Sequence, residues 1–324
     1  MSEAKYTPEE IISRLELKPV TKYQSEIISS PLEPSVVIAG AGSGKTETMS
    51  NRVLYLVANG FVTPDQILGL TFTRKAAGEL SVRIRKRLRQ LAAHKDFKHI
   101  TSTSTSVTTY HSYAGKLLSE HAIRYGIDAD AEPLGEAAIW QIASDVVRNW
   151  SDDSYRNQSA VSTVIKDLLG LSKLMLEHQV KAEDIERIGN EVLLSLQPLT
   201  GSSNAEVRDV AKAMRQRNSL LPMVEVFMQR RKAAGEFSFD DQMSLAADIA
   251  QNFEDVGVLE RGKYKVVLLD EYQDTSQSQV RMLSSLYGGG HPVMAVGDPS
   301  QAIYTWRGAS AGTMASFAKY FPKN

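Results

Sequence analysis

The sequence predicts an α/β fold in which a parallel sheet is interrupted by an all-helical insertion. Short apolar runs at 36–38, 67–72 and 266–269 end in polar residues and are separated by helical patterns, which is typical of a parallel sheet. From about Gly115 to Gly235 the apolar residues instead follow a helical period, with no convincing strand. We therefore expect a sheet domain formed by residues 1–114 and 236–324, and a helical subdomain at 115–235.

The composition is that of an ordinary globular protein. The 324 residues are 42% apolar and 23% charged, and the net charge is −1, so attraction to nucleic acid must come from local patches. The absence of cysteine excludes disulfides and Cys-ligated zinc, and six scattered histidines make a metal site of protein ligands alone improbable. No apolar run approaches the ~20 residues of a membrane helix, and no signal-peptide pattern opens the chain. We expect a cytoplasmic protein without a membrane partner.

The stretch Val36–Thr46 carries the strongest local pattern, because a β-branched run breaks into glycines and ends in lysine and a hydroxyl. Glycines let successive backbone N–H groups curl around an anion, and the following helix aims its positive end at the same place. The usual pattern begins with glycine where Ala39 stands, and a plain glycine turn is the alternative. We predict a nucleotide site formed by Ala39, Gly40, Ala41, Gly42, Ser43, Gly44, Lys45 and Thr46, with Thr46 on Mg²⁺.

Two short helices are expected ahead of this loop. Thr7-Pro8-Glu9-Glu10 is a capping pattern, and a second helix opens at Thr21 with Gln24 in its first turn. A primary amide offers a donor and an acceptor together, which complements the edge of adenine. Gln24 is therefore a candidate for base recognition, and an exposed helix glutamine is the alternative.

The strand predicted at 266–269 delivers two adjacent carboxylates, Asp270 and Glu271. Beside a phosphate loop, Asp270 can complete the Mg²⁺ shell, and Glu271 can polarise the water that attacks the γ-phosphorus. The alternative is a strand that simply ends in solvent. A further strand at 293–296 leads to Gln301, which could sense the γ-phosphate.

A basic stretch follows the strand at 67–72. Nine Lys and Arg residues lie between Arg74 and Lys98, against only Glu79 and Asp96. Such a run is either a solvated helix face or a surface that meets a polyanion. Its helix is expected to bury every third or fourth residue, namely Ala77, Leu80, Ile84, Leu88 and Leu91. The strand end itself carries Phe72, Thr73, Arg74 and Lys75, and Phe72 could stack on a base.

Two further segments carry aromatic or polar side chains. Residues 107–112 are expected to be a strand end with outward polar side chains, among them His111. Tyr304, Trp306 and Arg307 form an aromatic and cationic cluster suited to unpaired bases, with Trp306 as ordinary core as the alternative.

Taken in order, these motifs resemble those of the UvrD/Rep/PcrA-type superfamily 1 DNA helicases, N-terminal half. The resemblance covers the whole chain. The matching segments are Thr21-x-x-Gln24, Ala39–Thr46, Thr71–Ala77, Thr109–Ser112, Phe239–Asp241, Asp270–Thr275 and Gly297–Ala309. Ala39 is tolerated by that family. Arg74 stands where Asn is frequent, and Pro299-Ser300 where acidic residues are frequent.

The resemblance implies a RecA-like motor domain with a helical accessory domain, ATP-driven 3′→5′ movement on single-stranded DNA, strand separation at single-strand/duplex junctions, and a role in DNA repair or recombination. It implies that Gln24 reads adenine, that Lys45 and Thr46 bind phosphate and Mg²⁺, and that Asp270 completes the metal shell. Glu271 would be the catalytic base, Gln301 and Arg307 would link nucleotide state to DNA, and Phe72, Tyr304 and Trp306 would contact the strand.

In that family a second RecA-like domain follows and supplies arginines to the γ-phosphate, whereas this chain stops at Asn324. We therefore expect an N-terminal half whose own ATP hydrolysis is near background. Two alternatives remain open at this point. The chain could be the motor part of a RecB/AddA-like helicase–nuclease, or a nucleotide and single-strand DNA binding module without turnover.

Overall fold

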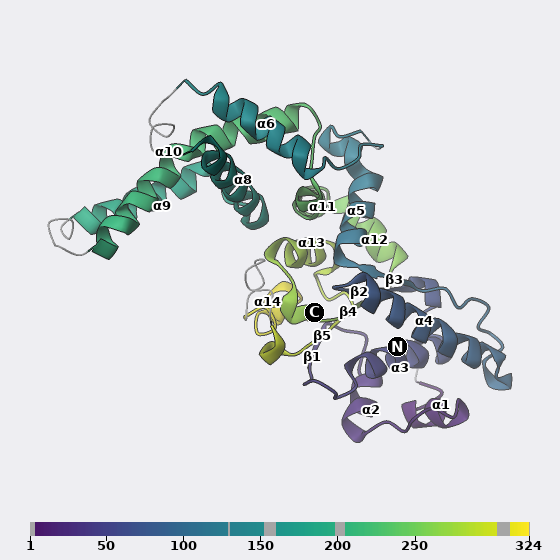
Figure 1. The fold of residues 1–324 in the computed structure, drawn as a ribbon. Helices are drawn as coiled ribbons and strands as arrows, with labels where there is room; N and C mark the ends of the chain where they lie inside the picture. The colour runs from purple at the N-terminus through teal and green to yellow at the C-terminus, as the bar shows by residue number, and fades with distance from the viewer. Residues whose placement is uncertain (1–3, 129, 152–159, 198–204, 303–311, 324) are drawn as a thin grey trace. The chain divides into compact units, whose positions relative to one another are not determined.

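The computed structural model describes residues 4–128, 130–151, 160–197, 205–302 and 312–323 (Figure 1). The chain forms two compact units, one from residues 1–117 with 246–324 and the other from residues 118–245. The two boundaries fall within the helices α5 (Tyr110–His121) and α11 (Phe239–Asn252).

Within the described residues, the first unit holds one sheet of five parallel strands in the order β1-β5-β4-β2-β3. The strands are β1 (Ser35–Ile38), β2 (Ile67–Thr71), β3 (Ser106–Thr109), β4 (Val266–Leu269) and β5 (Val293–Gly297). The parallel sheet, with helices before and after its strands, confirms the predicted α/β class. Because all strands are parallel, their carboxyl ends lie along one edge of the sheet.

Helices of the first unit follow the strands or precede them. They are α1 (Pro8–Arg14), α2 (Lys22–Ile28), α3 (Lys45–Ala58), α4 (Arg74–Ala93), α12 (Glu254–Lys263), α13 (Gln277–Tyr287) and α14 (Phe317–Tyr320), with short 3₁₀ turns at Pro64–Gln66, Lys95–Phe97, Tyr272–Asp274 and Pro299–Gln301. Thr7 caps α1 through a reciprocal capping box, as predicted. The second helix opens after Thr21, as predicted, and Thr21 also forms a capping box, with Gln24.

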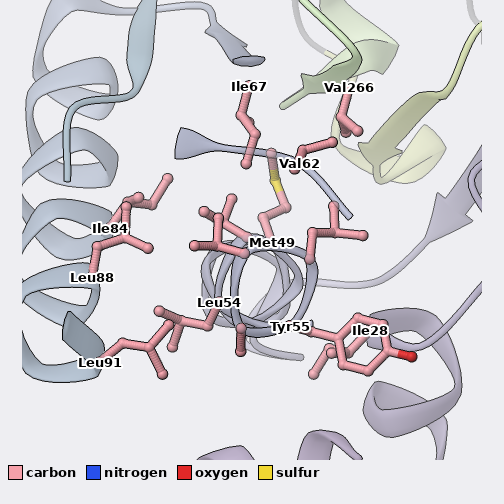
Figure 2. Close-up of a cluster of buried hydrophobic side chains, with 14 of the residues drawn as sticks. Ile28, Met49, Leu54, Tyr55, Val62, Ile67, Ile84, Leu88, Leu91 and Val266 are labelled. Carbon is pink, nitrogen blue, oxygen red and sulfur yellow. The ribbon is translucent and has the colours of Figure 1, made fainter. Parts of the chain in front are cut away.

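The core of this unit is built around α3, whose residues from Thr48 to Ala58 are all buried. Figure 2 shows side chains of α3 surrounded by those of α4 and of the strands. The labelled contributors include Met49, Leu54 and Tyr55 of α3, Ile84, Leu88 and Leu91 of α4, Ile67 of β2 and Val266 of β4. The five core positions predicted for α4 are the ones that it buries, because its apolar residues recur at the helical period.

One local expectation is corrected by the structure. Residues 107–112 are not a strand end throughout, because β3 ends at Thr109 and α5 begins at Tyr110. The Tyr110 ring is buried, and its hydroxyl donates a hydrogen bond to the backbone oxygen of Asp270, 3.0 Å away. A buried phenol needs such a partner, and beginning a helix at this residue gives it one.

The described part of the second unit is helical apart from its connections and one isolated bridge between Leu134 and Ser238. Besides the ends of α5 and α11, it contains the 3₁₀ turn Ala122–Tyr125 and the helices α6 (Glu136–Arg148), α8 (Val161–His178), α9 (Ala182–Leu196) and α10 (Ala205–Ala233). Side chains of α6, α8, α9 and α10 form its own apolar core. Across the described residues of both units, no helix combines the length and apolar character needed to cross a membrane.

Candidate nucleotide-binding site

The glycine-rich loop lies between the end of β1 at Ile38 and the start of α3 at Lys45. Gly42 (φ 73°) and Gly44 (φ 87°) adopt the left-handed backbone conformation that residues with a Cβ avoid. A Cβ on Gly44 would also lie 2.9 Å from Gln24 Nε2. Gly44 caps α3 without a side-chain hydrogen bond, so the first N–H groups of the helix remain available to an anion.

Gln24 contacts this loop directly. Its Oε1 accepts a hydrogen bond from the Thr21 backbone N–H at 3.0 Å, and its Nε2 donates to the Ser43 backbone oxygen at 3.1 Å. An amide has two N–H donors and two acceptor lone pairs, so one of each is left for a ligand. The loop and Gln24 border a pocket of about 390 Å³, lined also by Tyr23, Ile27, Ile38, Met294 and others.

The position of α2 relative to α3 is set by Arg52, a cation in the middle of α3 that is only 3% exposed. Its guanidinium donates to the backbone oxygens of Ile28 (2.6 Å), Ser30 and Pro31 (3.0 Å). Burial lowers the pKa of Arg52 to about 10. One side chain thus fixes the helix that carries Gln24 against the helix that begins with Lys45.

The first of the two predicted carboxylates, Asp270, follows β4 and is 5% exposed. Its Oδ1 accepts a hydrogen bond from the Glu271 N–H at 3.1 Å. Among the described residues its other carboxylate oxygen has no donor. Burial and the adjacent Glu271 raise the pKa of Asp270 from 3.8 to about 6, although the Glu271 N–H and Lys45 oppose the shift. Such a carboxylate favours a nearby cation.

Glu271 is held in a left-handed conformation (φ 50°), which is uncommon for a residue with a side chain. Its Oε2 lies 3.7 Å from Lys45 Nζ and accepts a hydrogen bond from Gln273 Nε2 at 2.8 Å. The carboxylate remains 37% exposed. The lysine that ends the loop and the glutamate two positions after β4 therefore meet at the edge of the sheet, although they are 226 positions apart.

Two polar residues of this site, Gln273 and Asp298, escaped the sequence analysis. Gln273 is 2% exposed, and its Oε1 accepts a hydrogen bond from the Asp298 N–H at 3.0 Å. A Cβ at Gly297 would lie 2.4 Å from that oxygen, so the glycine at the end of β5 makes room for the amide. Asp298 could have been found as a polar residue directly after the buried strand β5, whereas Gln273 lies four positions after β4 and had no such signal.

Gln301 lies next to Asp298 in the structure. Its Nε2 donates to Asp298 Oδ2, and the Ser300 N–H donates to Asp298 Oδ1 at 3.0 Å. The hydrogen bonds from Gln301 and from Ser300 lower the pKa of Asp298. Gln301 is thus brought to the same edge of the sheet as the glycine-rich loop.

Of the residues predicted to contact DNA, those that the structure describes follow β2 and β3 on this edge. Thr73 caps α4 by accepting a hydrogen bond from the Ala76 N–H at 3.1 Å, and Arg74, Lys75 and His111 are exposed. Phe72, just after β2, is partly buried. The segment with Tyr304, Trp306 and Arg307 lies outside the described residues.

The fold and this edge of the sheet define a P-loop α/β domain of the RecA-like type. Comparison of its sequence with family models gives a match over residues 20–322 to the UvrD/REP helicase N-terminal domain, so the chain belongs to that family.

Individual relatives agree with this assignment. The chain is 30% identical over 296 residues to the ATP-dependent DNA helicase UvrD1 of Mycobacterium bovis, covering 89% of the chain and 34% of that protein. It is 26% identical over 325 residues to UvrD1 of Mycobacterium leprae, covering 97% of the chain and 37% of that protein. It is 27% identical over 302 residues to the ATP-dependent DNA helicase PcrA of Staphylococcus aureus, covering 93% of the chain and 36% of that protein. The chain thus spans about a third of the length of these curated relatives.

Proposed function

We propose that this chain is the ATP- and single-stranded-DNA-binding part of an ATP-dependent 3′→5′ DNA helicase or translocase that acts in DNA repair or recombination. The observation that carries the proposal is the meeting of Lys45, at the end of the glycine-rich loop, with Glu271, beside the buried Asp270. In this proposal, residues 1–114 and 236–324 form the RecA-like ATP-binding domain, and residues 115–235 form the helical accessory subdomain.

The loop residues Ala39–Thr46 would bind the phosphates of ATP through their N–H groups and the Lys45 ammonium, and Gln24 would contact the adenine. Mg²⁺ would be held by the Thr46 hydroxyl and Asp270. Two features fit the cation: Asp270 has a carboxylate oxygen without a donor, and the partly buried Thr46 hydroxyl has no hydrogen-bond partner among the described residues. When bound, the ion neutralises charge on the phosphate oxygens.

Glu271 would act as the general base by accepting the proton of the attacking water. Its left-handed backbone turns the residue out of the strand direction, and Gln273 fixes Oε2 from one side. Lys45 lies near the same oxygen, so a triphosphate that engages the lysine would release the carboxylate for its role as a base. Gln301, held by Asp298, would respond to the γ-phosphate.

Single-stranded DNA, next to a single-strand/duplex junction, would contact Phe72, Thr73, Arg74, Lys75 and His111, together with Tyr304, Trp306 and Arg307. Stacking on an aromatic ring is worth about 1–3 kcal/mol per base and depends little on sequence. Gln301 and Arg307 would couple the state of the nucleotide to the affinity for DNA.

The test is equilibrium binding of a fluorescent ATP analogue and of an oligo(dT) 15-mer, followed by ATP hydrolysis with and without that oligonucleotide. We expect nucleotide binding that depends on Mg²⁺. Hydrolysis should stay near background for residues 1–324 alone, and should rise with DNA in the longest natural chain that contains them. The exposed Lys319→Ala variant serves as a matched control for substitutions at Lys45. Binding of both ligands without any DNA-dependent hydrolysis, even in the longest natural chain that contains these residues, would favour a binding module without turnover. Failure to bind either ligand would contradict the proposal.

A further inference from the structure

The helix α4 places five cations on one outward face. Arg74, Lys75, Arg85, Lys86 and Arg89 are all exposed, and we call them the α4 stripe. At 100° per residue they fall within an arc of about 120°, which does not overlap the arc of the buried residues. Among the described residues, no carboxylate lies within ion-pair distance of any of them. Glu79 is exposed at the margin of the stripe.

The other two arginines of α4 are treated differently by the fold. Arg87 donates to Glu47 and to Asn51 Oδ1 (2.8 Å) on α3, and Arg83 lies 3.6 Å from Glu47. These two cations therefore pair with side chains of α3 within the fold. The cations of α4 therefore fall into two groups, and within this helix only the stripe is left for a partner outside the described residues.

The stripe has the shape and chemistry of a phosphate-binding surface. From Arg74 to Arg89 it is about 22 Å long at the rise of an α-helix, which matches roughly six base pairs of duplex at 3.4 Å each. Only Gly78 and the 66%-exposed Val82 lie between the cations, so no bulky side chain keeps a backbone away. It has no aromatic side chain, and single strands are held largely by base stacking on aromatic rings.

We propose that the α4 stripe binds the sugar–phosphate backbone of duplex DNA without reading its sequence. Its first residues, Arg74 and Lys75, also belong to the proposed single-strand track at the edge of the sheet, so the stripe continues from the point where single-stranded DNA would lie. The inference rests on the proposed function only in taking DNA as the partner. Since the chain has a net charge of −1, this attraction must be local.

The test compares two triple variants that change charge equally. Arg85→Glu/Lys86→Glu/Arg89→Glu alters the stripe but leaves Arg74 and Lys75 in place. Lys18→Glu/Lys265→Glu/Lys319→Glu alters exposed lysines elsewhere in the first unit. Fluorescence anisotropy with a mixed-sequence 20-bp duplex and with oligo(dT) 20-mer is measured from 50 to 300 mM salt, and circular dichroism with binding of an ATP analogue checks the fold.

The stripe variant is expected to lose at least tenfold in duplex affinity, and the slope of log K against log salt should weaken by about 2 to 3, which corresponds to the loss of three phosphate contacts. Its oligo(dT) affinity and the duplex affinity of the control should change by less than about threefold. Equal loss on duplex and oligo(dT), or a duplex loss no larger than that of the control, would overturn the inference. A wild-type chain that binds oligo(dT) but not duplex would overturn it while leaving the proposed function intact, whereas binding of neither would contradict both.

Discussion

The carboxyl edge of the sheet has two halves that differ in how they are built. The glycine-rich loop, Gln301 and Glu271 follow β1, β5 and β4, which are neighbours in the sheet although they are far apart in the sequence. We call this part, which we propose for ATP, the nucleotide half. Its polar groups are hydrogen-bonded to one another: Gln273 donates to the Glu271 carboxylate and accepts from the Asp298 backbone N–H. The other half, which we propose for DNA and call the DNA half, follows β2 and β3, and there Arg74, Lys75 and His111 are exposed.

The difference follows from the two ligands proposed for these halves. A triphosphate has a fixed shape and charge, so donors that are already held in place lose little conformational entropy when it binds. This gain in binding free energy offsets the free energy needed to bury these polar groups. A DNA strand presents different bases at each step, so its contacts must adapt. Substitutions in the nucleotide half should therefore act on folding and ligand binding together, whereas those in the DNA half should act on DNA binding alone.

The largest expected effect separates two residues within the nucleotide half. Lys45→Ala should weaken ATP binding by at least about 100-fold, because the ammonium contacts phosphate in the ground state. Glu271→Gln should leave ATP affinity within about threefold and stop hydrolysis in the active enzyme, since the carboxylate acts only on the attacking water. Isothermal titration with Mg-ATP measures the affinity of both variants, and a phosphate-release assay measures hydrolysis. Equal losses of affinity in the two variants would contradict the assigned roles.

The second effect tests the cost of burying Asp270. A folded-state pKa raised from 3.8 to about 6 means that the native protein binds more protons than the unfolded chain between these values. Stability should therefore fall as the pH rises through this window and stay lower above it. Asp270→Asn removes that cost and should raise the free energy of unfolding at pH 8 by about 3 kcal/mol, while Mg²⁺-dependent ATP binding is lost.

Urea unfolding at pH 4, 6 and 8 measures this effect, with the exposed Asp65→Asn variant as the control. The gain in Asp270→Asn should shrink toward zero near pH 4, where the wild-type carboxyl is itself protonated. A gain that does not change with pH would assign the effect to packing instead of charge.

The third effect tests the contact between Gly297 and Gln273. Gly297→Ala should destabilise the fold by about 2 kcal/mol, because its Cβ would lie 2.4 Å from Gln273 Oε1 and force the amide away. Combining it with Gln273→Ala, which removes the amide, should restore part of that loss in a double-mutant cycle measured by urea unfolding. Gly78→Ala is the control, since a Cβ there meets no atom within 4 Å. Additive losses at 297 and 273 would contradict the assigned contact.

The smallest effect lies in the DNA half. Phe72→Ala should weaken binding of an oligo(dT) 15-mer by about 1–2 kcal/mol through lost stacking, and should leave ATP affinity unchanged. Anisotropy titrations at fixed salt measure it, and the exposed Val258→Ala variant serves as the control. An unchanged DNA affinity would remove Phe72 from the proposed strand contacts.

Local patterns predicted much of this molecule. The helical period of the apolar residues predicted the buried positions of α4. The glycines of the loop predicted a backbone that curls around an anion, and Gly42 and Gly44 adopt the left-handed conformations that such a loop needs. The sequence also indicated polar residues at the ends of β4 and β5. It did not show which of them pair, because Gln273 and Asp298 are 25 positions apart and meet only after β4 and β5 have paired. The helix start at Tyr110 was missed for the same reason, since its partner is Asp270.

The three carbonyl groups that converge on Arg52 have a consequence for how this domain can vary in evolution. Surface loops usually accept inserted residues, because closing a slightly longer loop costs little entropy. The connection from α2 to β1 is different, since Ile28, Ser30 and Pro31 all present their carbonyl oxygens to one guanidinium. An insertion within residues 28–31 would leave a buried cation without partners, and lysine could not replace a planar group that donates to three acceptors. Length changes in this part of the chain should therefore be confined to the segment after Pro31.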